Sequence, residues 1–106
     1  MDKILIVDDE IRMRQLLRLY LEPIGYECSM ANDGIEALEK VKKETFDLIL
    51  LDVMMPMYDG FEVCKKITDS HPEVPIIMIT ALNDAESIVK GLDAGATDYV
   101  TKPFNG

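Results

Sequence analysis

Five short runs of aliphatic residues alternate along the chain with four longer segments in which apolar residues recur at helical spacing. The third run, Leu48 to Leu51, has four large aliphatic side chains in succession. Such a run is typical of a central strand that is covered on both faces of a parallel sheet. The pattern predicts strands at residues 3–7, 26–31, 48–51, 74–80 and 97–101.

The segments between these strands predict helices with recognisable ends. The first helix runs from near Met13 to the break at Pro23 and Gly25. The second is capped by Asp33, and Glu36 stands where a capping box needs a carboxylate. Each of these helices therefore has both an apolar face and a defined boundary.

The third helix opens at Asp59 and ends before Pro72, and the fourth is capped by Asn83 or Asp84. Several apolar residues are expected to face the core: Ile35, Leu38 and Val41 in the second helix, and Ile88, Val89 and Leu92 in the fourth. Since a helix joins each strand to the next, the strands should be parallel with right-handed crossovers. The sequence predicts a three-layer α/β sandwich.

Length and composition are those of one globular domain, with 106 residues of which 48% are hydrophobic and 29% charged. A formal net charge of -9 opposes binding to nucleic-acid phosphates. The apolar runs are far shorter than the roughly 20 residues of a membrane helix, and the first residues have no signal-peptide layout. We expect a cytoplasmic protein that does not itself bind nucleic acid or membranes.

Acidic, hydroxyl and basic residues follow four of the predicted strands: Asp8 and Asp9, Asp52, Thr80, and Lys102. In an open α/β sheet the ligand crevice lies beyond the carboxyl ends of the strands, so these side chains should converge. Two carboxylates 4 Å apart repel by about 4 kcal/mol at an effective dielectric constant of 20. A hard divalent cation such as Mg²⁺ relieves this repulsion and keeps positions open for a phosphoryl group. Asp52, alone on the central strand, is the best candidate for a carboxylate nucleophile.

Each residue alone has a more ordinary interpretation. A single aspartate at a strand end usually caps a turn or helix, and His71 is interpreted as a loop residue. Met54, Met55 and Met57 are interpreted as loop-packing residues because thioethers do not suit hard cations. The site is inferred from the coincidence of acids, hydroxyl and lysine at four strand ends.

These residues make the whole chain resemble the receiver domain of two-component response regulators. The matching motifs are Ile6-Val7-Asp8-Asp9-Glu10, Leu51-Asp52-Val53-Met54-Met55-Pro56 with Asp59-Gly60, Ile79-Thr80-Ala81, and Ala94-Gly95-Ala96 with Asp98-Tyr99 and Lys102-Pro103-Phe104. The resemblance implies a doubly wound, flavodoxin-like sheet of strand order 2-1-3-4-5. It also implies a phosphorylation-activated switch that catalyses only its own phosphorylation and dephosphorylation.

By this resemblance, Asp52 would accept a phosphoryl group from a phosphohistidine of a sensor histidine kinase or phosphotransfer protein. Asp9, Asp52 and the main-chain carbonyl of Met54 would bind Mg²⁺, with Asp8 acting through a water and with Mn²⁺ able to substitute. Thr80 and Lys102 would bind the phosphoryl oxygens.

The resemblance also assigns a switch. Tyr99 would turn inward as Thr80 moves toward the phosphate, and the conformational change would reach an effector or output domain. The Lys102–Pro103 peptide bond would be cis, which aims the lysine into the site.

Two departures from the family pattern lead to further expectations. Residues 1–106 are expected to be a receiver domain truncated before its fifth helix, which normally helps to form the face used for dimerisation. The apolar surface of Val100, Phe104 and the first helix should then favour a homodimer or a swapped oligomer. Met54 and Leu82, two places after Asp52 and Thr80, are both apolar, and we hypothesise that they prolong the lifetime of the acyl phosphate.

Other functions stay open at this point. A metal-dependent phosphohydrolase usually needs a carboxylate where Met54 stands, and a flavodoxin-like nucleotide binder needs a glycine-rich phosphate loop where the acids Asp8, Asp9 and Glu10 stand. A degenerate receiver would take no phosphate. The sequence does not name the kinase, the output, or a longer regulator to which the domain belongs.

Overall fold

Strands and helices alternate along the chain as the pattern predicts, in a computed structural model that describes residues 2–55 and 59–102. The elements are β1 (Lys3–Val7), α1 (Ile11–Leu21), the 3-10 turn η1 (Glu22–Ile24), β2 (Glu27–Ala31), α2 (Gly34–Lys43), β3 (Leu48–Leu51), α3 (Gly60–Ser70), β4 (Ile76–Thr80), α4 (Ala85–Asp93) and β5 (Asp98–Thr101). The predictions for Met57, for the Lys102–Pro103 peptide bond and for Phe104 fall outside the described residues.

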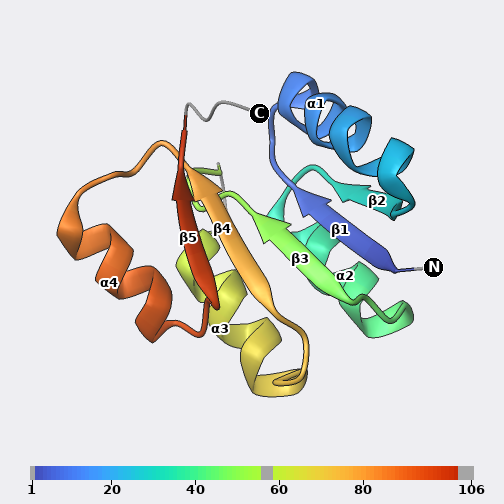
Figure 1. The fold of residues 1–106 in the computed structure, drawn as a ribbon. Helices are drawn as coiled ribbons and strands as arrows, with labels where there is room; N and C mark the ends of the chain where they lie inside the picture. The colour runs from blue at the N-terminus through green and yellow to red at the C-terminus, as the bar shows by residue number, and fades with distance from the viewer. Residues whose placement is uncertain (1, 56–58, 103–106) are drawn as a thin grey trace.

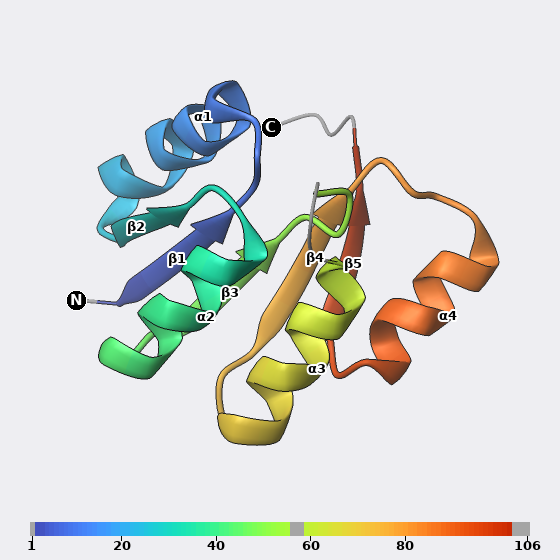
Figure 2. The ribbon, with the colours of Figure 1, turned by 180° about the vertical axis from the view of Figure 1, so that it is seen from behind.

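The five strands form one parallel sheet in the order β2-β1-β3-β4-β5. Figures 1 and 2 show α1 on one face, α2 and α3 on the other, and α4 beside β5. The three-layer, doubly wound architecture is confirmed. Because the chain leaves β1 toward one face and β3 toward the other, the carboxyl ends of these two neighbouring strands border a crevice.

Each face of the sheet has its own hydrophobic cluster. Leu5, Ile49 and Met78 are fully buried on the face covered by α2 and α3. On the α1 face, Leu50 and Ile79 are buried with relative exposures of 7% and 9%. The self-association that we expected of this second face stays a prediction.

Carboxylates set the start of three helices, and at α3 the Asp59 carboxylate accepts a hydrogen bond of 2.9 Å from the Phe61 N–H. Asp33 accepts a hydrogen bond from the Glu36 N–H at 2.8 Å, and the Glu36 carboxylate accepts one from the Asn32 N–H at 2.8 Å. This is the predicted capping box with its return bond shifted by one residue. Of the two candidates for α4, Asp84 is the cap, because its carboxylate accepts a bond of 3.0 Å from the Ser87 N–H.

Three helix residues predicted to face the core are exposed instead: Ile35 in α2, and Val89 and Leu92 in α4. α2 buries Gly34, Ala37 and Val41, which places Ile35 on the outer side of the first turn. α4 packs through Gly91, where an added Cβ would lie 2.9 Å from a ring carbon of Tyr99. This close approach turns Val89 and Leu92 away from the sheet.

Candidate metal centre

The three acids of the predicted site lie together at the carboxyl edge of the sheet. Asp8 follows β1 and Asp52 follows β3, in register because Val7 is paired with Leu51. Carboxylate oxygens of Asp8, Asp9 and Asp52 lie within 4.8 Å of one another. Asp8 and Asp52 have relative exposures of only 2% and 5%, whereas Asp9 is exposed. The cluster therefore opens to solvent on the Asp9 side.

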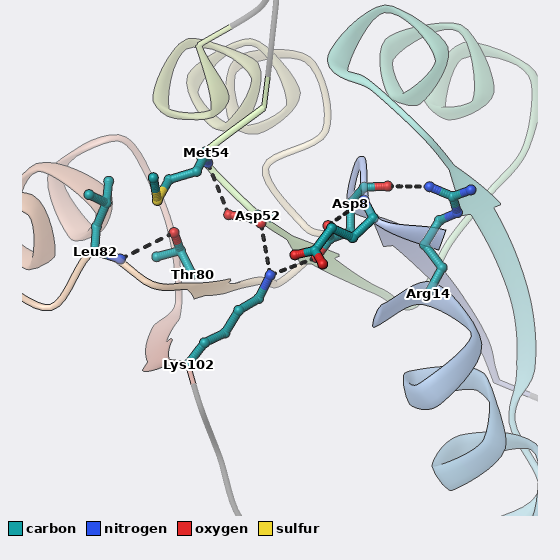
Figure 3. Close-up of polar contacts among 8 residues, drawn as sticks. Asp8, Arg14, Asp52, Met54, Thr80, Leu82 and Lys102 are labelled. Atoms are coloured by element: carbon teal, nitrogen blue, oxygen red, sulfur yellow. Dashed lines mark hydrogen bonds and ion pairs between the residues drawn. The ribbon is translucent and has the colours of Figure 1, made fainter. Parts of the chain in front are cut away.

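Lys102 joins the two buried acids. It follows β5, and its main-chain N–H donates to the Thr80 carbonyl at 2.8 Å, which fixes it beside the end of β4. Its Nζ donates to Asp8 Oδ2 and to Asp52 Oδ2, each at 2.9 Å (Figure 3). One ammonium group thus bridges two carboxylates from different strands.

Burial and charge pairing act in opposite directions on these groups. Burial raises the pKa of Asp8, and the hydrogen bonds from the Glu10 N–H and from Lys102 only partly oppose this effect. Burial also lowers the pKa of Lys102, but the hydrogen bonds to Asp52 and Asp8 outweigh it, so that this pKa is raised. Lys102 is therefore a firmly charged cation next to an acid that is costly to ionise.

Main-chain N–H groups orient the remaining carboxylate oxygens. Asp8 Oδ1 accepts from the Glu10 N–H and Asp52 Oδ1 from the Met54 N–H, each at 2.9 Å. These local turns hold both carboxylates toward the space that they share with Asp9. The donor set is made of hard oxygens at a separation that one ion can span, so it fits a divalent cation such as Mg²⁺.

Thr80 and Tyr99 both contact the main chain of Leu82 next to this cluster. The Thr80 side chain is fully buried, and its Oγ1 accepts a bond of 3.5 Å from the Leu82 N–H. The half-buried Tyr99 donates its hydroxyl proton to the Leu82 carbonyl at 2.7 Å. Burial and the charges of Asp84 and Asp52 raise the Tyr99 pKa, which keeps the hydroxyl a donor. The main chain of Leu82 therefore contacts both residues of the expected switch.

Met54 and Leu82 lie on the β4 side of Asp52 in Figure 3. The Met54 side chain is 52% exposed, and that of Leu82 is half-buried. Of these two residues, only Met54 makes a polar contact with Asp52, through its main-chain N–H.

Sequence reasoning missed Arg14, which reaches the site from α1. Its Nη1 donates to the main-chain carbonyl of Asp8 at 2.6 Å (Figure 3). The residue stands one turn after the acids, and its residue type does not distinguish it from Arg12, which is exposed. The helical register alone could have indicated which arginine faces back toward the strand.

No helix in the described part of the chain is long and apolar enough to cross a membrane.

Comparison with known proteins agrees with the geometry. Residues 4–106 match the family described as the response regulator receiver domain. The chain is 50% identical over 103 residues to the transcriptional regulatory protein ResD of Bacillus subtilis (strain 168), covering 97% of this chain and 42% of that protein. It is 47% identical over 102 residues to the response regulator MprA of Mycobacterium leprae (strain TN), covering 96% and 45%. The chain spans less than half the length of these curated relatives.

Solved structures resemble the whole fold. A receiver domain protein from Methanospirillum hungatei superposes with a TM-score of 0.95 at 36% identity, over 99% of this chain and 84% of that one. The response regulator protein TrrA of Thermotoga maritima, solved in complex with Mg(2+)-BeF, gives a TM-score of 0.90 at 39% identity, over 99% and 90%.

Proposed function

The chain belongs to the response regulator receiver domain family, and from this premise we propose that it is a signalling switch activated by phosphorylation of Asp52. The donor is a phosphohistidine of a sensor histidine kinase or phosphotransfer protein. The observation that carries the proposal is the buried pair Asp8 and Asp52 bridged by Lys102 and open to solvent at Asp9. The proposal includes a cytoplasmic location.

In the proposed reaction an Asp52 carboxylate oxygen attacks phosphorus, and the bond from phosphorus to the donor nitrogen breaks. Lys102 then exchanges a carboxylate contact for a phosphoryl oxygen, which needs little movement because its Nζ already lies 2.9 Å from Asp52. Asp9, Asp52 and the Met54 carbonyl would hold Mg²⁺ or Mn²⁺, with Asp8 acting through a water. When bound, the ion neutralises charge on the transferred group.

Thr80 and Tyr99 relay the event in this proposal. A new hydrogen bond from Thr80 to the phosphoryl group replaces its long contact of 3.5 Å with the Leu82 N–H. A hydrogen bond to a charged group is worth about 1.5–3 kcal/mol, which is the order needed to change the populations of two states. Tyr99 follows because its hydroxyl is bonded to the carbonyl of the same residue, Leu82, whose N–H contacts Thr80.

The test is intact-mass spectrometry after incubation with Mg²⁺ and a small acyl phosphate. We expect one added phosphoryl group on the wild type and on Asp47→Asn, which changes an exposed aspartate at the opposite end of β3. Asp52→Asn and the chelated wild type should show none. An adduct on Asp52→Asn, or one that forms on the wild type after the metal has been chelated, contradicts the proposal.

The relay has a separate test. Thr80→Ala should still be phosphorylated on Asp52 but bind its effector poorly when phosphorylated, whereas Thr80→Ser should keep most of the response because it retains the hydroxyl. Full effector binding by phosphorylated Thr80→Ala would refute the relay through this residue.

Met54 and Leu82 are proposed to prolong the phosphorylated state, because neither side chain can orient a water for attack on the acyl phosphate. Replacing them together, by Met54→Asn with Leu82→Glu, should speed dephosphorylation severalfold. If the double variant lost phosphate at the same rate as the wild type, this role of Met54 and Leu82 would be contradicted.

The residues described here act as a receiver module whose output lies in another domain or protein. The curated relatives include transcriptional regulatory proteins that are more than twice as long as the matched region. A net charge of -9 makes this domain alone unsuited to nucleic acid, so we propose that a separate output domain or effector makes any such contact.

A further inference from the structure

Three arginines of α1 have different surroundings. Arg12 is exposed, and Arg18 forms an ion pair of 3.0 Å with Glu22 on the helix surface. Arg14 is half-buried and turns back to the carboxyl edge of the sheet, where its Nη1 donates to the Asp8 carbonyl at 2.6 Å (Figure 3). It lies close to a cluster of carboxylates, yet the bond that it makes is to a main-chain oxygen.

This bond completes the anchoring of Asp8. The Asp8 N–H donates to the Ala31 carbonyl at 3.2 Å, and its two carboxylate oxygens accept from the Glu10 N–H and from Lys102. Within the described residues no side chain other than that of Arg14 binds the Asp8 carbonyl. Every polar group of Asp8 therefore has a partner, and those partners lie in β2, just before α1, within α1 and just after β5.

Asp9 is the opposite case. Its carboxylate is exposed and, across residues 2–55 and 59–102, forms neither a hydrogen bond nor an ion pair. The direction of its side chain is set by the peptide unit that joins it to Asp8, and the oxygen of that unit is the acceptor for Arg14. A tilt of this peptide would move the Asp9 carboxylate relative to those of Asp8 and Asp52.

We propose that Arg14 is a positioning residue for the metal site, in which the guanidinium fixes the Asp8–Asp9 peptide and so aims Asp9 at the cation. A charge-assisted bond from a planar guanidinium is short and directional, which suits this task better than a flexible ammonium. The guanidinium also adds positive charge near three carboxylates without occupying a carboxylate oxygen. The inference rests on the proposed function, because it assigns Asp9 to the metal.

The experiment measures Mg²⁺ affinity of the metal-free protein by calorimetry in four proteins: the wild type, Arg14→Gln, Arg14→Lys and Arg12→Gln. Arg14→Gln should bind Mg²⁺ about tenfold more weakly, since loss of a group that orients a metal ligand typically costs 10–100-fold in affinity. Arg12→Gln removes the same charge from the same helix without this bond, so its affinity should stay close to that of the wild type. Arg14→Lys keeps the charge and should recover only part of the loss.

Phosphorylation by a small acyl phosphate gives the second readout. At saturating Mg²⁺ the Arg14→Gln rate should return to nearly the wild-type rate, because the defect lies in apparent metal affinity and not in the transfer step. Urea unfolding without metal shows that each variant is folded.

Equal Mg²⁺ affinities of Arg14→Gln and Arg12→Gln would overturn the inference, as would a loss of rate that saturating Mg²⁺ does not restore. The proposed function fails differently. It fails if the wild type takes no phosphoryl group on Asp52, while the calorimetric comparison of the variants still decides the role of Arg14.

Discussion

Two lysines, one at each edge of the same sheet, are each shared between two carboxylates. At the carboxyl edge, Lys102 lies 2.9 Å from both Asp8 and Asp52, and the side chains have relative exposures of 12%, 3% and 6%. At the amino edge, Lys3 contacts Glu44 at 2.5 Å and Glu27 at 3.9 Å, with exposures of 27%, 36% and 59%. Both clusters combine one lysine with two carboxylates, but water reaches the cluster around Lys3 more easily than the one around Lys102.

Because of this difference in exposure, the pKa shifts of Glu44 and Asp8 have opposite signs. The hydrogen bond from Lys3 lowers the pKa of Glu44, whereas burial raises the pKa of Asp8 despite its bond to Lys102. Water screens the exposed cluster, so its charges are compensated with or without the lysine. The buried cluster keeps an unfavourable acid that a further cation would stabilise. Burial at a strand end, more than the presence of acids, therefore distinguishes the proposed metal site from the cluster around Lys3.

Local packing explains why the amino edge stays a structural feature. The Asp47 carboxylate accepts from the Lys3 main-chain N–H at 2.8 Å, and the Lys3 Nζ lies 5.4 Å from the centre of the Phe46 ring. These contacts join β1 to the segment before β3. A cavity at this edge, lined partly by Phe46 and His71, includes none of the residues proposed for phosphoryl transfer.

The largest expected effect comes from removing each lysine. Lys102→Met should lower the free energy of unfolding by about 2 kcal/mol in metal-free buffer at pH 7, because two buried carboxylates lose their cation. Lys3→Met should cost less. Urea unfolding measures both, and added Mg²⁺ should restore more stability to Lys102→Met than to Lys3→Met. Equal losses without metal would show that burial does not distinguish the two clusters.

Removing one acid from each cluster should have opposite effects. Because the folded-state pKa of Asp8 is raised, its stabilising contribution is complete below its ordinary value of 3.8 and is lost as pH rises through the raised value. Asp8→Asn should thus raise the free energy of unfolding at pH 7 in metal-free buffer, while weakening Mg²⁺ binding.

Glu44→Gln is the matched change at the other edge. The lowered Glu44 pKa gives stability that is present at neutral pH and lost as pH falls, so this substitution should slightly destabilise the protein. Denaturant titrations at pH 7 compare the two variants. Destabilisation by Asp8→Asn in metal-free buffer would contradict the burial account.

Mg²⁺ affinity should depend on pH through Asp8. The metal competes with protons for this carboxylate, so affinity should begin to fall at a pH above the usual range of an aspartate as the solution is acidified. Calorimetry of the wild type between pH 7 and pH 4 tests this point. A decline that starts only near 3.8 would show that burial does not govern the site.

The smallest effect concerns salt. The coupling between Lys3 and Glu44, measured by a double-mutant cycle, should vanish near 1 M salt, where the Debye length is about 3 Å. The coupling between Lys102 and Asp8 should largely persist because water and ions have little access to it. If salt weakened both couplings equally, the distinction between the exposed and the buried cluster would be wrong.

The sequence predicted the sheet and the place where Asp8, Asp52 and Lys102 meet. Strands that alternate with helices form a parallel sheet, and the carboxyl ends of parallel strands lie at the same edge. It did not predict which helix residues face inward where a small residue controls the packing. Gly91 lets α4 approach Tyr99 so closely that Val89 and Leu92 turn outward. Apolar spacing alone does not contain that information.

The contact of Arg14 with Asp8 was missed for a related reason. Its partner is a main-chain carbonyl, which every residue has and no sequence pattern marks. The burial of Asp8 and Asp52 could not be predicted either, because it depends on the register between β1 and β3, which only the structure gives.

The most direct test of the central claim is to locate the phosphoryl group. Borohydride reduces an aspartyl phosphate to homoserine, and peptide mass spectrometry of the phosphorylated, reduced protein then identifies the position. The account predicts homoserine at position 52, with Asp8 and Asp9 unchanged. Homoserine at position 8 or 9, or a stable phosphate on another side chain, would show that Asp52 is not the phosphoacceptor.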